Sequence, residues 1–294
     1  MEPDWNDLRY LLAVARTGSL AGAARSAGVR HSTVGRRLDA LEIALGGKLV
    51  DRGASGASLT AMGERLVPLA ARAEEAVRAL VTAATGGQRR LKVATPTGFA
   101  AILARPVAEF LRKNPTIGID IVSSSGRADL DRGEADIAIR MGPVDGPDLI
   151  ARQVGAVGWS LYASEAYLAD RPDIDLANGL AGHLLVGFGA GMAGSAAQGW
   201  LDAHASHATV ALRQSQMSEV VAAAAEGAGA ALLPCVLADA EPRLQRLTAE
   251  VLVRQPVTLV FRRDTGEDPA GRRAIQMLAT ALRNARAALG GDRR

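Results

Sequence analysis

The residues from 30 to 42, RHSTVGRRLDALE, combine hydrogen-bond donors with positive charge at the start of an expected helix. Val34, Leu38, Leu41 and Leu45 recur at intervals of four, three and four residues, which predicts one apolar helix face. The opposite face begins with His31, Ser32, Thr33, Gly35, Arg36 and Arg37. Short polar side chains at the N-terminal end of a helix reach base edges in the major groove of DNA, and flanking cations hold phosphate. These six residues are therefore candidate DNA contacts, and the alternative is a basic surface that only meets solvent.

The two adjacent arginines suit two different roles. A guanidinium paired with O6 and N7 of guanine is the commonest specific base contact, and either Arg36 or Arg37 fits it. The sequence leaves open which of them reads a base and which holds phosphate. Gly35 costs the helix about 1 kcal/mol relative to alanine, and a close approach of another molecule to the backbone would explain that cost. Arg52, in an expected hairpin, is a further phosphate-contact candidate or a solvated arginine.

The flanking sequence predicts the elements that position this helix. Residues 5–46 have the pattern of three short helices, with Ser19 placed to cap the second and Gly28 to turn the chain before the third. Small residues in the second helix let another helix approach closely, as in a helix-turn-helix. Asp7, in the first helix, is expected at the surface.

A hairpin completes the predicted N-terminal domain. Residues 48–60, KLVDRGASGASLT, place two extended pieces around a turn of small residues, which suits a β-hairpin wing. The first 90 residues hold 13 Lys and Arg against 9 Asp and Glu, whereas the rest of the chain holds 21 against 22. This uneven charge points mildly to a polyanionic partner of the N-terminal part. Residues 1–59 are therefore predicted to form a winged helix-turn-helix domain, mostly α, that binds double-stranded DNA.

A long helix follows the hairpin. Thr60 is placed to cap a helix that runs to about residue 84, where TGGQRR ends it. Apolar residues along this helix alternate spacings of three and four, as in a heptad seam. A helix between two domains has no core of its own, so pairing with a second copy is favoured over packing within one chain. Residues 60–86 are predicted to dimerise through Leu66, Leu69, Ala73 and Leu80.

From Leu91 onward the hydrophobic period changes. Short apolar runs such as LKVAT, IGIDIVSS, ADIAIRMG and VTLVFRR alternate with helical stretches, which is typical of an α/β architecture with mostly parallel strands. About 200 residues are many for one small sheet, so two subdomains are expected. We predict an effector-binding domain at 89–294, in which subdomain I comprises 89–159 and 262–294 and subdomain II comprises 160–261.

Polar residues that suit a small-molecule ligand follow the predicted strands. The loop ATPTG leads into a helix whose free N–H groups and dipole favour an anion or a carboxylate. Thr95 and Thr97 add hydroxyl donors there. The other candidate effector-binding residues are Ser124, Ser125, Arg140, Ser215 and Gln216. The alternative for each is ordinary loop capping or a surface salt bridge.

Several kinds of site are not expected. The single cysteine, Cys235, excludes an intramolecular disulfide and is predicted to be a buried small hydrophobe rather than a redox sensor. No metal site, no cofactor and no catalytic constellation are predicted. The sequence has no signal segment and no run of about 18 apolar residues, so a cytoplasmic protein without a membrane span is expected.

One glycine pattern imitates a cofactor site. Gly189, Gly191 and Gly194 follow an apolar run with the spacing of a dinucleotide fingerprint, and Arg213 lies about 20 residues further on, as in NADP-binding proteins. Such sites usually occupy the first βαβ unit of their domain, whereas this one comes much later. A plain glycine loop is favoured, and an NADP-dependent oxidoreductase is the alternative.

Long stretches of the chain resemble one known family. LRYLLAVARTGSLAGAARSAGVRHSTVGRRLDALEIALGGKLVDR and LTAMGERL are similar to the N-terminal winged helix-turn-helix of LysR-type transcriptional regulators. LKVATPTGFA, GEADIAIRMG and GAGAALLP match the second domain of that family, so the resemblance covers nearly the whole chain. It implies a DNA-binding domain, a dimerising linker helix and an α/β effector domain of two Rossmann-like subdomains, like type 2 periplasmic binding proteins. Members usually assemble from homodimers into a homotetramer.

The third helix departs from the family's pattern. Where members commonly have Ser-Gln-Pro and then a serine before the basic pair, this chain has Arg30, His31 and Ser32 and then Gly35. Base contacts of the family's glutamine are therefore not transferred to His31. The predicted function is sequence-specific, DNA-binding transcriptional regulation in response to a small-molecule effector bound between the two subdomains. A small-molecule binding protein with a non-functional helix-turn-helix is the second candidate.

Overall fold

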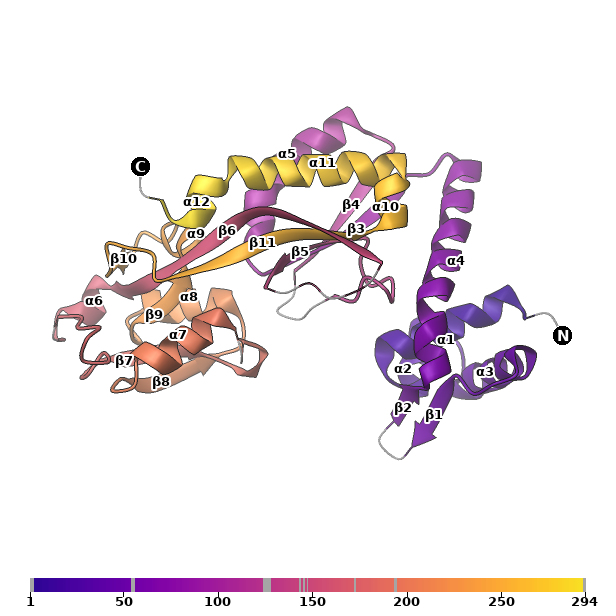
Figure 1. Cartoon of the computed structure of the whole chain (residues 1–294), viewed down its shortest axis with the longest axis horizontal. Helices are drawn as coiled ribbons and strands as arrows, with labels where there is room; N and C mark the ends of the chain where they lie inside the picture. Colours follow the sequence, from indigo (N-terminus) through magenta and orange to yellow (C-terminus); the bar gives the residue numbers. More distant parts are fainter. Residues whose placement is uncertain are drawn as a thin grey trace. The chain divides into compact units, whose positions relative to one another are not determined.

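A computed structural model describes residues 3–53, 56–123, 128–142, 144, 146, 148–171, 173–192 and 195–292. The chain forms two compact units (Figure 1). The N-terminal unit comprises Met1–Arg90 and Asp129–Asp136, and the C-terminal unit comprises Leu91–Ala128 and Ile137–Arg294. Each unit has a hydrophobic core of its own.

The N-terminal unit is a winged helix-turn-helix followed by a long helix. Its helices are α1 (Trp5–Thr17), α2 (Leu20–Ala27), α3 (His31–Leu45) and α4 (Ala61–Thr85), and β1 (Val50–Gly53) pairs antiparallel with β2 (Gly56–Leu59). Asp4, Ser19 and Thr60 cap α1, α2 and α4 by accepting hydrogen bonds from backbone N–H groups. Gly28 ends α2 at a φ of 65°, the left-handed conformation that the tight turn into α3 requires.

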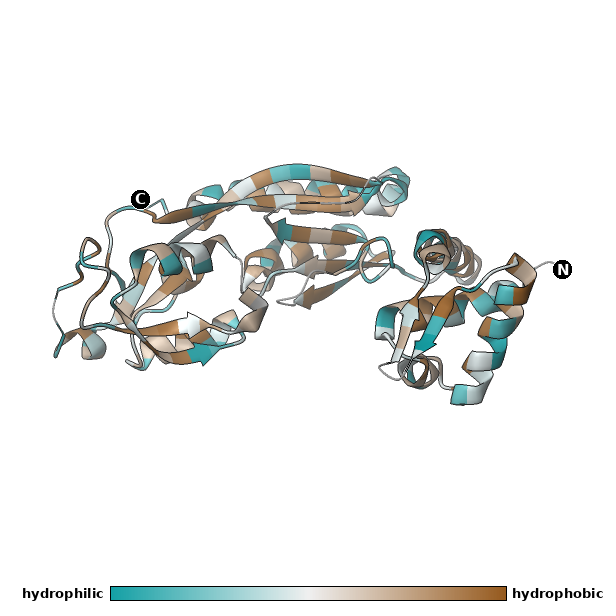
Figure 2. Cartoon of the chain, turned by 60° about the horizontal axis from the view of Figure 1, so that its bottom comes forward, coloured by the Kyte–Doolittle hydropathy of each residue, from teal (hydrophilic) through white to brown (hydrophobic). Residues whose placement is uncertain are grey.

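The apolar faces of these helices meet in one core. Val34, Leu38 and Leu41 of α3 are buried together with Leu11 and Leu12 of α1. Figure 2 shows brown and teal segments alternating along the helices of this unit, as amphipathic helices require. The leucine-spaced stripe is therefore the anchor of α3, and the polar face that opens RHSTVGRRLDALE points away from the core.

The C-terminal unit contains two sheets. The larger has the order β10-β6-β11-β5-β3-β4, with β9 also paired to β6, and β7 and β8 form the smaller one. The bounds are β3 (Arg89–Thr95), β4 (Ile117–Ser123), β5 (Ile137–Met141), β6 (Leu149–Ser164), β7 (Leu184–Phe188), β8 (Thr209–Gln214), β9 (Ala231–Pro234), β10 (Leu244–Arg246) and β11 (Val253–Arg262). β3 and β5 are parallel, as are β7 and β8, whereas the long strands β6 and β11 run antiparallel to each other. The predicted α/β class is confirmed, but the expectation of mostly parallel strands is wrong, because β6 pairs antiparallel with β9, β10 and β11, and β11 pairs antiparallel with β5.

Helices cover these sheets. They are α5 (Phe99–Lys113), α6 (Glu165–Leu168), α7 (Ala196–His204), α8 (Met217–Ala225), α9 (Cys235–Ala238), α10 (Arg263–Glu267), α11 (Pro269–Asn284) and α12 (Arg286–Gly290), with a short 3-10 helix η1 (Ala190–Met192). α5 and α11 lie side by side, and α12 packs on β6 (Figure 1). No helix in the described parts of the chain is long and apolar enough to cross a membrane.

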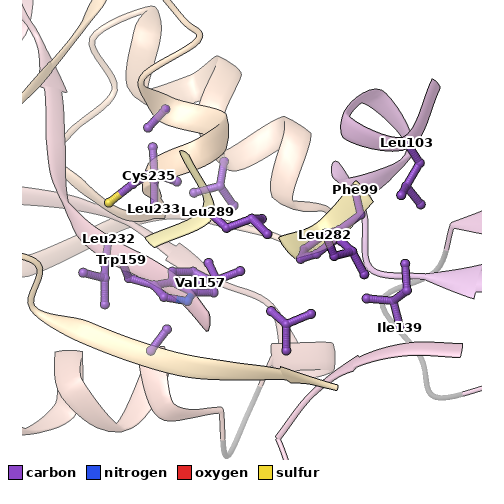
Figure 3. Close-up of a cluster of buried hydrophobic side chains, with 14 of the residues drawn as sticks. Phe99, Leu103, Ile139, Val157, Trp159, Leu232, Leu233, Cys235, Leu282 and Leu289 are labelled. Atoms are coloured by element: carbon purple, nitrogen blue, oxygen red, sulfur yellow. The ribbon is translucent and has the colours of Figure 1, made fainter. Parts of the chain in front are cut away.

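The lone cysteine lies inside the core of the C-terminal unit. Cys235 is buried near Leu232 and Leu233, in the same cluster as Trp159 and Leu289 (Figure 3). Burial raises the pKa of the Cys235 thiol, which disfavours the reactive thiolate. The prediction of a buried small hydrophobe is confirmed.

One buried carboxylate joins α3 to the hairpin. Glu42 accepts hydrogen bonds from the backbone N–H groups of Leu49 at 2.9 Å and Val50 at 3.2 Å, and it pairs with Lys48. Burial alone would raise the pKa of Glu42, but the hydrogen bonds from Lys48, Leu49 and Val50 outweigh burial and hold the pKa below its ordinary value. Glu42 therefore fixes the start of β1 relative to α3.

Replacing Glu42 by alanine is expected to lower the free energy of unfolding of the N-terminal unit by about 3 kcal/mol, because two buried N–H groups lose their acceptor. Since the folded pKa is depressed, the contribution of ionised Glu42 is present above a pH of 4.5 and is lost as the pH falls through the folded pKa. Glu42→Gln keeps an acceptor oxygen and is expected to lose less stability while flattening the pH dependence in that window. Urea unfolding at several pH values measures both effects, and equal stability of wild type and Glu42→Ala at neutral pH would contradict this role.

Candidate DNA-binding and effector-binding sites

The N-terminal end of α3 presents polar side chains to solvent. His31, Ser32 and Arg36 are exposed, and Thr33 is partly exposed. Arg30 stands at the cap position and makes no side-chain capping hydrogen bond, in contrast to the cap residues of α1, α2 and α4. The first N–H groups of α3 are therefore open to an external acceptor such as a phosphate.

The two adjacent arginines have different surroundings. Arg37 Nη1 lies 3.3 Å from Asp4 Oδ2 and 3.4 Å from Asp7 Oδ1, so it braces α3 against α1. The exposed Arg36 side chain makes no ion pair or hydrogen bond with the residues that the structure describes. Arg36 is thus the guanidinium open to an outside partner, a distinction that the sequence did not provide.

Asp7 differs from the sequence-based expectation of a surface residue. Its side chain is buried, and burial raises its pKa although Arg37 acts in the opposite direction. The expectation was wrong because Asp7 lies on the face of α1 that meets α3. A pairing with a residue 30 positions away leaves no local pattern in the sequence.

Arg52 of β1 is also engaged within the protein. Its Nη2 lies 2.7 Å from Asp39 Oδ1 and 3.4 Å from the carbonyl oxygen of Gly35. A Cβ added to Gly35 would meet nothing among the described residues closer than Arg52 Nη1, at 3.9 Å. Packing within the described residues therefore does not require glycine at position 35.

The candidate effector residues lie where parallel strands end. β3 and β5 are parallel neighbours, so Thr95 at the end of β3 and Arg140 near the end of β5 belong to the same edge of the sheet. Ser215 and Gln216 directly follow β8, which is parallel to β7. Ligands of α/β proteins bind outside such carboxyl edges. Ser124 and Ser125 lie outside the described residues.

Several of these candidates have structural roles. Gln216 forms a capping box with Glu219 at the start of α8, and Arg140 Nη2 donates to the carbonyl oxygen of Ala128 at 2.8 Å. Thr95 is buried. Thr97 is partly exposed and Ser215 is exposed, so these two hydroxyls are the most accessible of the described set.

The loop ATPTG, which is predicted to bind an anion, leads directly into α5. Gly98, at a φ of 97°, precedes α5 and provides no side-chain cap. A Cβ on Gly98 would lie 2.6 Å from Leu237 Cδ2, so α9 packs directly on this glycine. The first N–H group of α5, at Phe99, donates to the carbonyl oxygen of Pro96 at 3.2 Å, and the Leu237 side chain forms an apolar wall beside Gly98.

Sequence reasoning missed two buried polar atoms on the long strands. The indole N–H of Trp159 on β6 and the side-chain oxygen of Gln255 on β11 are buried and have no hydrogen-bond partner among the described residues. Val253 pairs with Trp159 and Gln255 pairs with Val157, so both side chains project from the same face. Phe188 meets Trp159 edge-on, with ring centroids 6.2 Å apart. Because a tryptophan in an apolar strand predicts core, no sequence signal pointed to this pair.

The glycine loop after β7 uses its polar groups within the protein. β7, α7 and β8 form a parallel βαβ unit, which resembles a dinucleotide fold in outline. However, Gly189 N donates to the carbonyl oxygen of Gln214, Ser195 caps α7, and Arg213 Nη1 donates to the carbonyl oxygen of Phe188. Gly194 lies outside the described residues. The groups that would hold a pyrophosphate are thus engaged elsewhere.

The long helix α4 carries two apolar faces. Val67, Ala70 and Ala71 are buried in the core of the N-terminal unit, and Leu66 packs against that core. A second face is open, with each side chain more than half exposed, at Leu69, Val77, Leu80 and Val81. Ala73 is partly exposed. Of the predicted dimerisation residues, Leu69 and Leu80 lie on the open face, whereas Leu66 belongs to the core.

Comparison with known proteins agrees with this arrangement. Residues 5–64 match the family described as "Bacterial regulatory helix-turn-helix protein, lysR family", and residues 84–283 match "LysR substrate binding domain". This chain belongs to the LysR family. The resemblance read from the sequence and the predicted fold class are both confirmed.

Individual LysR relatives match over part of their length. An "HTH-type transcriptional regulator" of Xanthomonas campestris pv. campestris is 31% identical over 57% of this chain and 50% of its own. The regulator CrgA of Neisseria meningitidis serogroup C is 31% identical over 64% of either chain. The chain thus spans between half and two thirds of the length of these curated relatives. A solved structure of CrgA has 26% identity and a TM-score of 0.56, covering 95% of this chain and 98% of its own. These relatives are named as transcriptional regulators, which removes support for the oxidoreductase alternative.

Replacing Arg36 by alanine is expected to weaken binding to a specific duplex by about 10- to 100-fold, the range for losing a bidentate base contact. Its melting temperature is expected to stay within about a degree of wild type, because the side chain is exposed and unpaired among the described residues. Fluorescence anisotropy with a labelled duplex and thermal unfolding provide the two measurements.

Arg37→Ala is the matched control for this experiment. It is expected to lower the melting temperature, because the buried Asp7 carboxylate loses its partner. Below its melting transition it is expected to bind the specific duplex more tightly than Arg36→Ala does. The reverse order of the two variants would contradict the assignment.

Proposed function

We propose that this protein is a sequence-specific regulator of transcription that binds double-stranded DNA through α3. The observation that carries the proposal is the contrast within one helix. Its apolar stripe is buried, while its start combines open N–H groups, short polar side chains and the unpaired Arg36. His31, Ser32, Thr33, Gly35 and Arg36 are proposed to face DNA directly.

In this proposal the C-terminal unit binds a small effector, and a carboxylate or another anion fits the start of α5 best. An effector changes DNA binding only if its affinity differs between two conformations of the protein. The two sheets of the C-terminal unit, β10-β6-β11-β5-β3-β4 and β7-β8, are proposed to shift relative to each other. The proposal also includes a cytoplasmic location. It divides the chain into a DNA-binding domain at 1–59, a dimerisation helix at 60–86 and an effector-binding domain at 89–294.

The experiment that tests DNA recognition uses fragmented genomic DNA of the source organism. The full chain is mixed with the fragments at several salt concentrations, and the retained DNA is sequenced. Reproducible enrichment of a few fragments, each confirmed as a salt-sensitive gel shift, supports the proposal. If no fragment competes better than bulk DNA, the chain is a small-molecule binding protein with a non-functional helix-turn-helix.

We further propose that the open face of α4 pairs two chains and that such dimers assemble into a homotetramer. An exposed apolar stripe on a single helix is destabilising unless a partner covers it. Leu69, Val77, Leu80 and Val81 provide that stripe.

Leu80→Glu is expected to weaken dimerisation by about 30-fold or more, as for a buried interface anchor, because a carboxylate would be desolvated in the seam. Ala79→Glu adds the same charge beside the stripe and is expected to leave the dimer intact. Sedimentation equilibrium of the two variants measures the change. A dimer of unchanged affinity in Leu80→Glu would exclude this face.

A screen of small carboxylates and other anions is expected to yield a ligand that raises the melting temperature, because ligands of the folded state stabilise it. Thr97→Ala is expected to reduce that shift, whereas Thr209→Ala, an exposed threonine at the start of β8, is expected to keep it. In a variant with Trp5 and Trp200 replaced by phenylalanine, the ligand is expected to change the fluorescence of Trp159. A ligand whose shift of the melting temperature is the same in Thr97→Ala as in wild type, and that leaves the Trp159 fluorescence unchanged, would place the site elsewhere.

A further inference from the structure

The arginine of the hairpin is turned back onto α3. Arg52 Nη2 lies 2.7 Å from Asp39 Oδ1, and the same nitrogen lies 3.4 Å from the carbonyl oxygen of Gly35. Gly35 and Asp39 are four residues apart, so they stand one above the other on the same helix face. The guanidinium therefore extends over one turn of α3 instead of extending into solvent from the hairpin.

Gly35 keeps the helix surface beside this guanidinium free of a side chain. The nearest described atom to a Cβ at position 35 is Arg52 Nη1, at 3.9 Å. A larger side chain there would project into the space beside the guanidinium. The backbone carbonyl of Gly35 and the Arg52 guanidinium are thus in contact, at a position where glycine costs the helix about 1 kcal/mol relative to alanine.

Stability does not account for the ion pair of Arg52 and Asp39. The two side chains are 39% and 48% exposed, and pairs this exposed contribute little to folding. Arg37, by contrast, pairs with the buried Asp7 and holds two helices together. A half-exposed carboxylate in the middle of α3, one turn after Arg36, also repels phosphate, so Asp39 is costly for DNA binding unless it has another role.

We propose that Asp39 is a positioning residue that holds Arg52 over Gly35, so that Arg52 and Arg36 present guanidinium groups to the same groove of duplex DNA. This inference rests on the proposed function. Asp39 lies three residues after Arg36, which places both on one side of the helix. Two guanidiniums fixed on one surface match neighbouring acceptor pairs on base edges, such as O6 and N7 of guanine. Arg52 then acts as part of the recognition helix rather than as a separate phosphate contact.

The variant Asp39→Asn gives opposite results under the two interpretations. If Asp39 only adds negative charge, its removal raises affinity for every duplex. If Asp39 positions Arg52, affinity for the specific duplex falls about fivefold to tenfold, while affinity for a scrambled duplex stays the same or rises. Asp39→Glu, which keeps the carboxylate, is expected to retain most of the specific affinity.

A double-mutant cycle completes the test. Arg52→Ala is expected to lose specific affinity, and Asp39→Asn combined with Arg52→Ala is expected to lose no more than Arg52→Ala alone. Anisotropy titrations of the full chain with specific and scrambled duplexes, at several salt concentrations, provide the affinities. Thermal unfolding of each variant reports on folding.

Three outcomes would overturn the proposal. These are an Asp39→Asn variant that binds the specific duplex as tightly as wild type or more tightly, losses that add in the double variant, and equal losses on both duplexes with a lowered melting temperature. Failure of the proposed function is seen separately, because wild type would then prefer no duplex over the scrambled one.

Discussion

The burial of Val34, Leu38 and Leu41 against α1 is the constraint on which the N-terminal unit depends. A helix buried along one stripe has only one rotation about its axis that satisfies its core. That rotation decides which residues of RHSTVGRRLDALE are exposed, and it leaves Arg36 outside while Arg37 meets α1. Glu42, one residue after Leu41, then ties the hairpin to the same helix through two backbone N–H groups. The candidate DNA surface is thus a consequence of how the opposite face packs.

Ion pairs within the N-terminal unit reduce the number of its cations that are open to an outside partner. Its net positive charge suggests many free cations, yet Arg37, Lys48 and Arg52 each have a carboxylate partner. The partners differ in burial and therefore in effect. Asp7 and Glu42 are buried and serve the fold, whereas Asp39 is half exposed and contributes little to it. The count of charges along the sequence identified a basic N-terminal region. Under the proposed function, specificity for a DNA sequence depends on which guanidinium groups are held by carboxylates and which are open.

Local patterns predicted the elements well because local physics forms them. The alternating spacing of Leu38 and Leu41, the cap at Ser19 and the turn at Gly28 each act within a few residues, and the structure has each of them. Contacts between distant residues were not predictable in this way. The pairing of Asp7 with Arg37 and the turn of Arg52 onto α3 depend on how elements pack after they form. The same holds for Trp159 and Gln255, whose unpaired atoms become visible only when β6 and β11 are in register.

Those unpaired atoms bear on how an effector acts on the C-terminal unit. A buried donor or acceptor without a partner costs about 1 to 3 kcal/mol, and Trp159 Nε1 and Gln255 Oε1 have no partner among the described residues. Under the proposed function, a ligand that reached these two atoms in one conformation only would supply the missing partners in that conformation. Its binding energy then differs between conformations, which is the condition for shifting their populations.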